Sequence, residues 1–145
     1  MNSVDDLIEH LDFLARSLSF YDERYIVKIF LLEAGISTCG CGFDYINEAV
    51  LLWYSESMRR VSKEIYPAIA KKYRPYATME QVEKTISRAV DRAWKKRDQM
   101  WETFFPEPQR PTNTEFISRM AKILEMWVDR CEFLARMEGG EHSEI

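Results

Sequence analysis

The sequence has few of the residues that interrupt helices, because only five glycines and five prolines occur among its 145 residues. Most other residues, notably leucine, alanine, glutamate, lysine and arginine, lose little side-chain freedom in a helix. Hydrophobic residues make up 46% and charged residues 30% of the chain, a composition typical of globular proteins. A chain of this length is too short for two well-formed cores. We therefore expect one all-α domain.

Long apolar runs are also absent, and none approaches the roughly 20 residues that a bilayer-spanning helix needs. The first ten residues, MNSVDDLIEH, are acidic, whereas a secretory signal begins with a basic segment. The three cysteines are odd in number, and Cys39 and Cys41 lie too close in sequence for an easy bridge to each other. These features predict a protein of the reducing cytoplasm with no membrane partner.

Residue patterns for metal binding and catalysis are missing as well. A structural zinc site needs four ligands, and no further cysteine or histidine pair complements Cys39, Cys41 and Cys131. His10 lies in an acidic segment and His142 lies three residues from the C-terminus, so neither has an evident nucleophile or acid partner. The sequence predicts no metal, no cofactor and no enzymatic activity.

The charge of the chain is small overall but unevenly distributed. The net charge is −4, yet the segment from Arg59 to Arg97 holds twelve Lys or Arg and four Asp or Glu, a local charge of +8. The rest of the chain, with eight basic and twenty acidic residues, carries −12. A basic segment between acidic ones is typical of a module that meets phosphate on one side. A solvated basic face is the alternative interpretation.

Helical spacing of apolar residues recurs in blocks along the chain, separated by glycine-rich or proline-rich breaks. We expect a compact bundle of about six helices, with an accessory helix in residues 1–24, the main domain in residues 25–138 and a frayed tail in residues 139–145. The predicted helices cover residues 3–19, 25–35, 43–58, 67–73, 79–97 and 113–138. The large aromatic side chains Trp53, Trp94, Trp101 and Trp127 fall on the apolar faces, where we expect core packing.

Two of the predicted helices begin with a capping box, in which two side chains satisfy each other's free backbone N–H groups. Thr78 with Gln81 starts the helix at 79, and Thr112 with Glu115 starts the last helix. The helix at 79–97 has an apolar inner stripe and a polar, mainly basic outer one. The outer stripe consists of Gln81, Lys84, Arg88, Arg92 and Lys95.

A short helix, a tight turn and a longer helix with a polar face form the pattern of a helix-turn-helix, whose second helix enters the major groove. Gln can pair with adenine, and Lys or Arg with guanine, so the outer stripe suits base reading. Flanking basic residues are candidates for phosphate contact, which sets register and supplies affinity. These candidates are Arg59, Arg60, Lys63, Lys71, Lys72, Arg92, Lys95, Lys96 and Arg97.

Several strings resemble, in order and spacing, the C-terminal DNA-binding domain of stage-zero sporulation protein A. They are YPAIAKKY (66–73), QVEKTISRAVDRAW (81–94), RPTNTEFISRMAKIL (110–124) and the earlier GISTCGCGFDYINEAV (35–50). The resemblance covers roughly Tyr25 to Trp127. It implies a compact helical bundle that reads duplex DNA with the helix 81–94. It also implies a transcription regulator whose family normally carries a phosphorylatable receiver, for which the first 24 residues show no pattern.

The sequence departs from the family within the expected reading helix. Gln81, Lys84 and Ser87 stand where the family has arginines, while Glu83 is retained. With Arg88 from the outer stripe, these residues complete the predicted base-reading set. Because Lys lacks the rigid fork of Arg, we expect an altered or weaker sequence preference. The turn at residues 74–80 is about two residues longer than the family's.

Two hypotheses therefore share one expected fold. The first is a receiver-less transcription regulator that binds duplex DNA in a sequence-specific manner. The alternative is a degenerate member of the fold that acts as a protein-interaction or antagonist module, consistent with the acidic flanks. Apolar faces on the first and last helices either cover the domain's own core or form the seam of a homodimer.

Overall fold

The computed structural model describes residues 3–75 and 77–143, and over these residues the chain is entirely helical, as predicted. None of the described helices is both long and apolar enough to cross a bilayer. In chain order the elements are α1 (Ser3–Leu18), α2 (Glu23–Glu33), α3 (Gly42–Ser55), the π-helical turn η1 (Val61–Ile65), α4 (Tyr66–Lys72), α5 (Met79–Lys96), α6 (Gln99–Phe104) and α7 (Asn113–Ser143).

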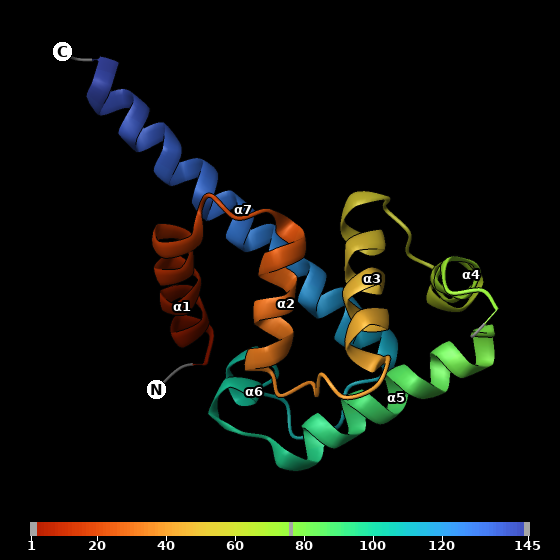
Figure 1. Cartoon of the computed structure of the whole chain (residues 1–145). Coiled ribbons are helices and arrows are strands. Elements are labelled where there is room, and N and C mark those ends of the chain that lie inside the picture. The colour runs from red at the N-terminus through yellow and green to blue at the C-terminus, as the bar shows by residue number, and fades with distance from the viewer. Residues whose placement is uncertain (1–2, 76, 144–145) are drawn as a thin grey trace.

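The long helix α7 runs behind the shorter helices, and several of them pack against it (Figure 1). It packs against α1, α2, α3 and α5, while α3 also packs against α2, α4 and α5. α5 crosses the foot of the molecule below α3, and α4 lies near the N-terminal end of α5 (Figure 1). The last turns of α7 project beyond the other helices. This arrangement gives α5 one face against the bundle and leaves the other face outward.

Aromatic side chains fill the core where α6 and α7 meet. Trp101, Phe105 and Phe116 are buried, with ring centroids 4.7 Å apart for Trp101–Phe105 and 4.8 Å apart for Phe105–Phe116. Offset ring stacking of this kind adds to the burial of apolar area. The predicted core role of the tryptophans is confirmed: Trp101 and Trp127 are buried, and Trp53 and Trp94 pack half-buried against the core.

The predicted helices do not include α6, a short helix between α5 and α7. Arg97 adopts a left-handed conformation with φ 38°, which ends α5, and the Asp98 carboxylate then accepts a hydrogen bond from the Trp101 N–H at 2.9 Å. A helix of six residues is too short to show a full apolar period, so its sequence signal is weak. Burial of Trp101 and Phe104 holds it in place.

The end of α7 also differs from the prediction. The helix continues through Gly139 and Gly140 to Ser143, where the sequence indicated a stop at the glycines. Glycine costs only about 1 kcal/mol in a helix interior, and extending a helix that is already formed adds one hydrogen bond per residue. Residues 144–145 of the expected tail lie outside the described residues.

The first helix covers the core of its own domain. Leu11, Leu14 and Ala15 of α1 are buried, and Asp12 forms an ion pair with Arg130 of α7. The Arg130 hydrogen bond, followed by that of Arg16, lowers the pKa of Asp12. The sequence allowed two roles for the apolar stripe of α1, core packing and a dimer seam. The buried residues of this stripe pack in the core of the domain.

Glycines allow α2 to end and α3 to approach α5. Gly35 has φ 91° and lets the Ile36 N–H bond to the Leu31 carbonyl at 2.9 Å, which closes α2 at its predicted C-terminal glycine. At Gly42 a Cβ atom would lie 2.9 Å from the Ala89 Cβ and 3.4 Å from the Thr85 carbonyl oxygen. The start of α3 thus sits directly on α5.

Replacing Gly42 by alanine tests this contact. We expect Gly42→Ala to lower the free energy of unfolding by about 1–3 kcal/mol, because the added methyl group overpacks the α3–α5 contact. The double variant Gly42→Ala/Ala89→Gly removes the Ala89 methyl group that the new one would meet, so it should recover most of the lost stability. The remaining loss should be the cost of placing a glycine within a helix. Urea denaturation measures both. Gly139→Ala is the matched control, since no heavy atom lies within 4 Å of a Cβ there, and it should not destabilise. Equal stability of Gly42→Ala and the wild type would contradict the close approach.

Candidate nucleic-acid interface

The two faces of α5 separate as the sequence predicted. Val82, Ile86, Val90 and Ala93 are buried against the bundle. The residues of the predicted outer stripe are all exposed: Gln81, Lys84, Arg88, Arg92 and Lys95. Asp91 forms an ion pair with Lys95 at 3.0 Å, and the acidic residues Glu80 and Glu83 are exposed near the start of α5. The exposed face of α5 is therefore predominantly basic along its length.

The capping box at the start of α5 is confirmed and restricts Gln81. The Thr78 hydroxyl accepts from the Gln81 N–H at 3.2 Å, and the Gln81 Oε1 accepts from the Thr78 N–H at 2.9 Å. A bidentate pair with adenine uses both the oxygen and the nitrogen of a glutamine amide. Gln81 therefore has its amide oxygen engaged, and its NH₂ group remains to donate.

Ser87 faces the loop before α7, unlike the rest of the predicted base-reading set. The Arg110 guanidinium donates to the Ser87 carbonyl at 2.8 Å and to its Oγ at 3.1 Å, and it also lies 3.4 Å from Asp91. Hydrogen bonding by Lys95 and the positive charges of Lys95 and Arg110 lower the pKa of the Asp91 carboxyl. This geometry does not favour base contact by Ser87. The sequence alone did not indicate Arg110, because its partners Ser87 and Asp91 lie on α5, far from it in the sequence.

Asn113 joins three helices at the first residue of α7. Its Nδ2 group donates to the Tyr66 hydroxyl of α4 at 3.0 Å and to the Glu83 carbonyl of α5 at 3.3 Å. Tyr66 is buried, and this burial raises the pKa of its hydroxyl. Glu83 contributes its backbone here, while its side chain is exposed. The string PTNTEF (111–116) thus caps the start of α7 and also holds α4 and α5 in place relative to each other.

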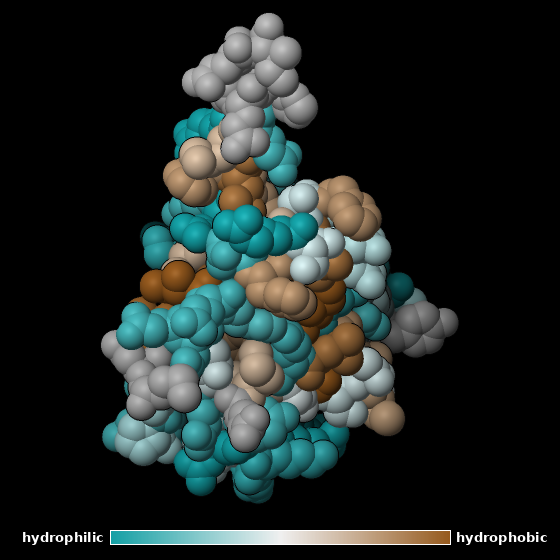
Figure 2. Space-filling model, turned by 90° about the vertical axis from the view of Figure 1, so that its left-hand side faces the viewer, coloured by the Kyte–Doolittle hydropathy of each residue, from teal (hydrophilic) through white to brown (hydrophobic). Residues whose placement is uncertain are grey.

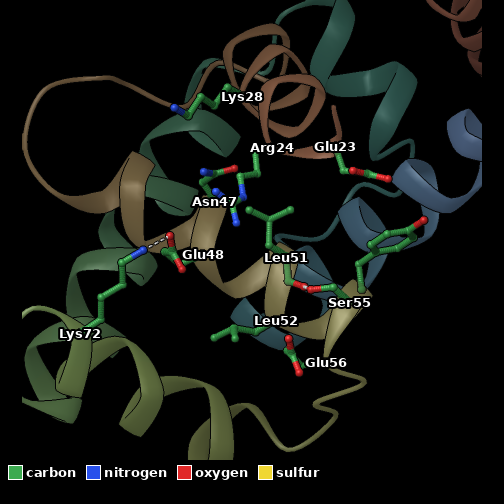
Figure 3. A pocket seen from close by; sticks show the side chains of 11 residues that line it. Glu23, Arg24, Lys28, Asn47, Glu48, Leu51, Leu52, Ser55, Glu56 and Lys72 are labelled. Atoms are coloured by element: carbon green, nitrogen blue, oxygen red, sulfur yellow. Dashed lines mark hydrogen bonds and ion pairs between the residues drawn. The ribbon is translucent and has the colours of Figure 1, made fainter. Parts of the chain in front are cut away.

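Lys72 turns away from α5 toward a cleft between α2, α3 and α4. The cleft has a volume of about 590 Å³, and Lys72 forms an ion pair with Glu48 on its wall (Figure 3). The hydrogen bond that Lys72 donates to the Glu48 carboxylate raises the pKa of Lys72. Arg24, Lys28, Glu23 and Glu56 also line this cleft, so its lining is of mixed charge. An engaged Lys72 is a weaker candidate for phosphate contact than Lys71.

Three further phosphate candidates make contacts within the domain. Arg59 lies over the Trp53 ring at 4.8 Å and donates to the Trp53 carbonyl, which closes the end of α3. Arg97 lies over the Trp94 ring at 4.9 Å. Lys95 is held by Asp91 as described above. Among the described residues, no partner is found for the side chains of Arg60, Lys63, Lys71, Lys84, Arg88, Arg92 and Lys96.

Acidic side chains gather on the side of the bundle away from α5. Burial raises the pKa of the Tyr54 hydroxyl, and the negative charges of Glu23, Glu132, Asp129 and Glu125 raise it further. These residues come from the start of α2 and the middle of α7, which lie opposite α5 in Figure 1. Part of the negative charge of the chain thus lies on the side of the bundle opposite α5.

No group of three or more His, Cys, Asp or Glu side chains is arranged to hold a metal ion in the described part of the chain. The feature that stands out is instead the unpaired cationic row on an outward-facing helix. A predominantly basic, outward-facing helix of this kind is typical of helical domains that bind an extended anion.

The chain matches the family model described as Sporulation initiation factor Spo0A C terminal over residues 27–124. It belongs to this family, a family of helical DNA-binding domains of a sporulation regulator. The resemblance noted in the sequence is thereby confirmed. The match begins within α2 and ends within α7, so α1 and the projecting half of α7 lie outside it.

A double-mutant cycle tests the joint at Asn113. We expect Asn113→Ala to lower the free energy of unfolding by about 1–3 kcal/mol, since two hydrogen bonds are lost and a buried partner is left unsatisfied. Combined with Tyr66→Phe, the two changes should be non-additive by about 0.5 kcal/mol or more. Urea denaturation gives each value. Thr114→Ala, at an exposed neighbouring position, is the control. Strict additivity would show that the two side chains do not interact.

Proposed function

We propose that the protein binds duplex DNA in a sequence-specific manner through a helix-turn-helix formed by α4 and α5, and that it regulates transcription. The observation that carries this proposal is the row of unpaired cations on the exposed face of α5. Membership of a family of DNA-binding domains supports it independently. DNA binding also agrees with the cytoplasmic location expected from the sequence.

The geometry of the two helices supports this mode of binding. α4 is seen nearly along its axis in Figure 1, while α5 lies across the view, so the two cross steeply as in a helix-turn-helix. The 18 residues of α5 span about 27 Å at 1.5 Å per residue. The major groove, about 12 Å wide, admits one helix of this kind.

Within this proposal Lys84 and Arg88 are the main base-reading residues, since both are exposed near the middle of the outward face and have no partner among the described residues. The Gln81 NH₂ group and the Glu83 carboxylate lie near the N-terminal end of the same helix. Arg92 and Lys96 continue toward its C-terminus, and Lys71 adds a cation from α4. These last three suit phosphate contact, which orients the helix on the duplex.

The alternative is a module of the same fold that binds a protein and not DNA. Exposed aromatic rings at the end of α1 and the start of α2 are the observation that favours it. The Tyr21 ring stacks on the Tyr25 ring and packs at a tilt against the Phe20 ring, with centroids 4.4 Å apart in each pair. These residues lie outside the family match. A protein module of this kind would not require the unpaired cations of α5.

A homodimer forms part of the proposal. Phe133 and Met137 are exposed on the projecting end of α7. Figure 2, which faces the side of α1 and this end of α7, shows hydrophobic patches among hydrophilic residues. Two chains joined there would match two half-sites on one duplex. In the titration described below, a stoichiometry of two chains per duplex would support the dimer. A stoichiometry of one chain on every duplex tested would contradict it.

The experiment is a titration of duplex DNA at several salt concentrations after selection of preferred sequences from random duplexes. The slope of log affinity against log salt should be about −0.9 per neutralised phosphate. Lys84→Ala should weaken binding to the selected sequence by about 1–3 kcal/mol and change the preference at one position. Lys71→Ala should weaken all sequences alike and reduce the slope by about one unit.

Lys122→Ala is the matched control, because Lys122 is an exposed lysine of α7 that pairs with Glu125 at 3.6 Å, on another face of the bundle. It should leave both affinity and slope unchanged. Absence of salt-dependent binding near physiological salt would refute DNA binding and favour the protein module. Equal small effects of Lys84→Ala and Lys122→Ala would refute the role given to α5.

A further inference from the structure

Two cysteines lie at the edge of the exposed face of α5. The loop between α2 and α3 carries Cys39 and Cys41, and both are exposed. Together with Arg88 and Arg92 of α5 they line one hollow of about 130 Å³. The lining of the hollow thus includes two cysteines and two arginines, from segments some fifty residues apart in the sequence.

Exposure distinguishes these thiols from ordinary structural cysteines, which are among the most buried residues. Cys131 provides the contrast within the same chain: it is half-buried, and burial, followed by the charge of Glu132, raises the pKa of its thiol. The thiolate is the reactive form, and reactive cysteines occupy electropositive, partly exposed surroundings. Cys39 and Cys41 are exposed and share a hollow with Arg88 and Arg92, whereas Cys131 is half-buried and lies near Glu132.

The groups around the hollow favour an anionic reagent over a metal cation. Two thiols can chelate a soft cation, but Arg88 and Arg92 line the same hollow and repel positive charge. Neither guanidinium has a partner among the described residues. Cys41 is also the N-cap residue of α3, and the N-terminal end of a helix favours a negative charge placed there. The nearby Asp44, at the start of α3, opposes this effect with its negative charge.

We propose that Cys41 is a thiol-modification site for anionic low-molecular-weight disulfides, which Arg88 and Arg92 attract. The Cys41 thiolate attacks one sulfur of the disulfide, a protein–S–S–R bond forms, and the original S–S bond breaks. The leaving thiolate carries away the electron pair and takes a proton from water. The Cys41 sulfur is oxidised and the leaving sulfur is reduced. The adjacent Cys39 is too close in sequence to displace the adduct easily.

The adduct changes the surface that the proposed function assigns to DNA, and this part of the inference rests on that proposal. An anionic group on Cys41 lies against Arg88 and Arg92 and neutralises cations that α5 would otherwise present to phosphate. It also adds bulk beside the helix that enters the groove. The modified protein therefore binds DNA more weakly, and reduction of the mixed disulfide restores binding.

The chemical part is tested on the full, reduced chain with two probes, oxidised glutathione, which is anionic, and cystamine, which is cationic. Intact-mass and peptide mass spectrometry should show one adduct at Cys41, formed at least about threefold faster with oxidised glutathione at low salt. Arg88→Gln/Arg92→Gln should abolish the preference. Modification of Cys131 at an equal rate, or no preference for the anionic probe, would overturn the site. An adduct that persists in Cys41→Ser but not in Cys39→Ser would overturn the choice of Cys41.

The functional part compares DNA affinity before and after modification. Oxidised glutathione should lower the affinity of the wild type about tenfold or more, dithiothreitol should restore it, and Cys41→Ser should be insensitive. Cys131→Ser is the control and should respond like the wild type. An adduct that leaves affinity unchanged would refute the regulatory effect. If the reduced protein does not bind DNA at all, the proposed function fails, and the preference for the anionic probe still decides the thiol site.

Discussion

The presentation of α5 depends on the hydrogen bonds that Asn113 makes at the start of α7. One side-chain amide reaches the Tyr66 hydroxyl on α4 and the Glu83 carbonyl on α5, so three helices meet at one polar group. Arg110 reinforces this joint from the preceding loop through Ser87 and Asp91. The apolar face of α5 supplies most of the burial, but burial alone is not directional. The hydrogen bonds fix how α5 is placed relative to α4, and the proposed groove binding depends on this placement.

With α5 fixed in this way, charge decides what the surface can meet. A chain of net charge −4 is not a general polyanion binder, yet α5 presents Lys84, Arg88 and Arg92 without partners among the described residues. Acidic residues collect near Tyr54 on the other side. Such a separation orients the molecule toward a polyanion and keeps its other side away from it. The exposed cysteines Cys39 and Cys41 place thiols, which can be modified, beside Arg88 and Arg92.

Much of this arrangement was predictable from the sequence because its signals are local. The capping boxes at Thr78 and Thr112, the C-terminal glycine of α2 and the two faces of α5 depend on residues within a few positions of one another. What escaped prediction depends on distant partners. Ser87, predicted to read bases, hydrogen-bonds Arg110, which lies 23 residues away in the sequence. Lys72, predicted to contact phosphate, pairs with Glu48, which lies 24 residues away. The short helix α6 is stabilised by core burial of Trp101, which a six-residue pattern does not reveal.

The most direct measurement of the central claim is an NMR titration of the isotope-labelled protein with a selected duplex, following backbone amide shifts. The account predicts that the largest changes fall on α5 around Lys84 and Arg88 and on the end of α4 at Lys71. Amides of α1 and of the projecting end of α7 should change little when one chain occupies one half-site. Changes confined to the exposed aromatic rings at Phe20, Tyr21 and Tyr25, with α5 unaffected, would contradict the account.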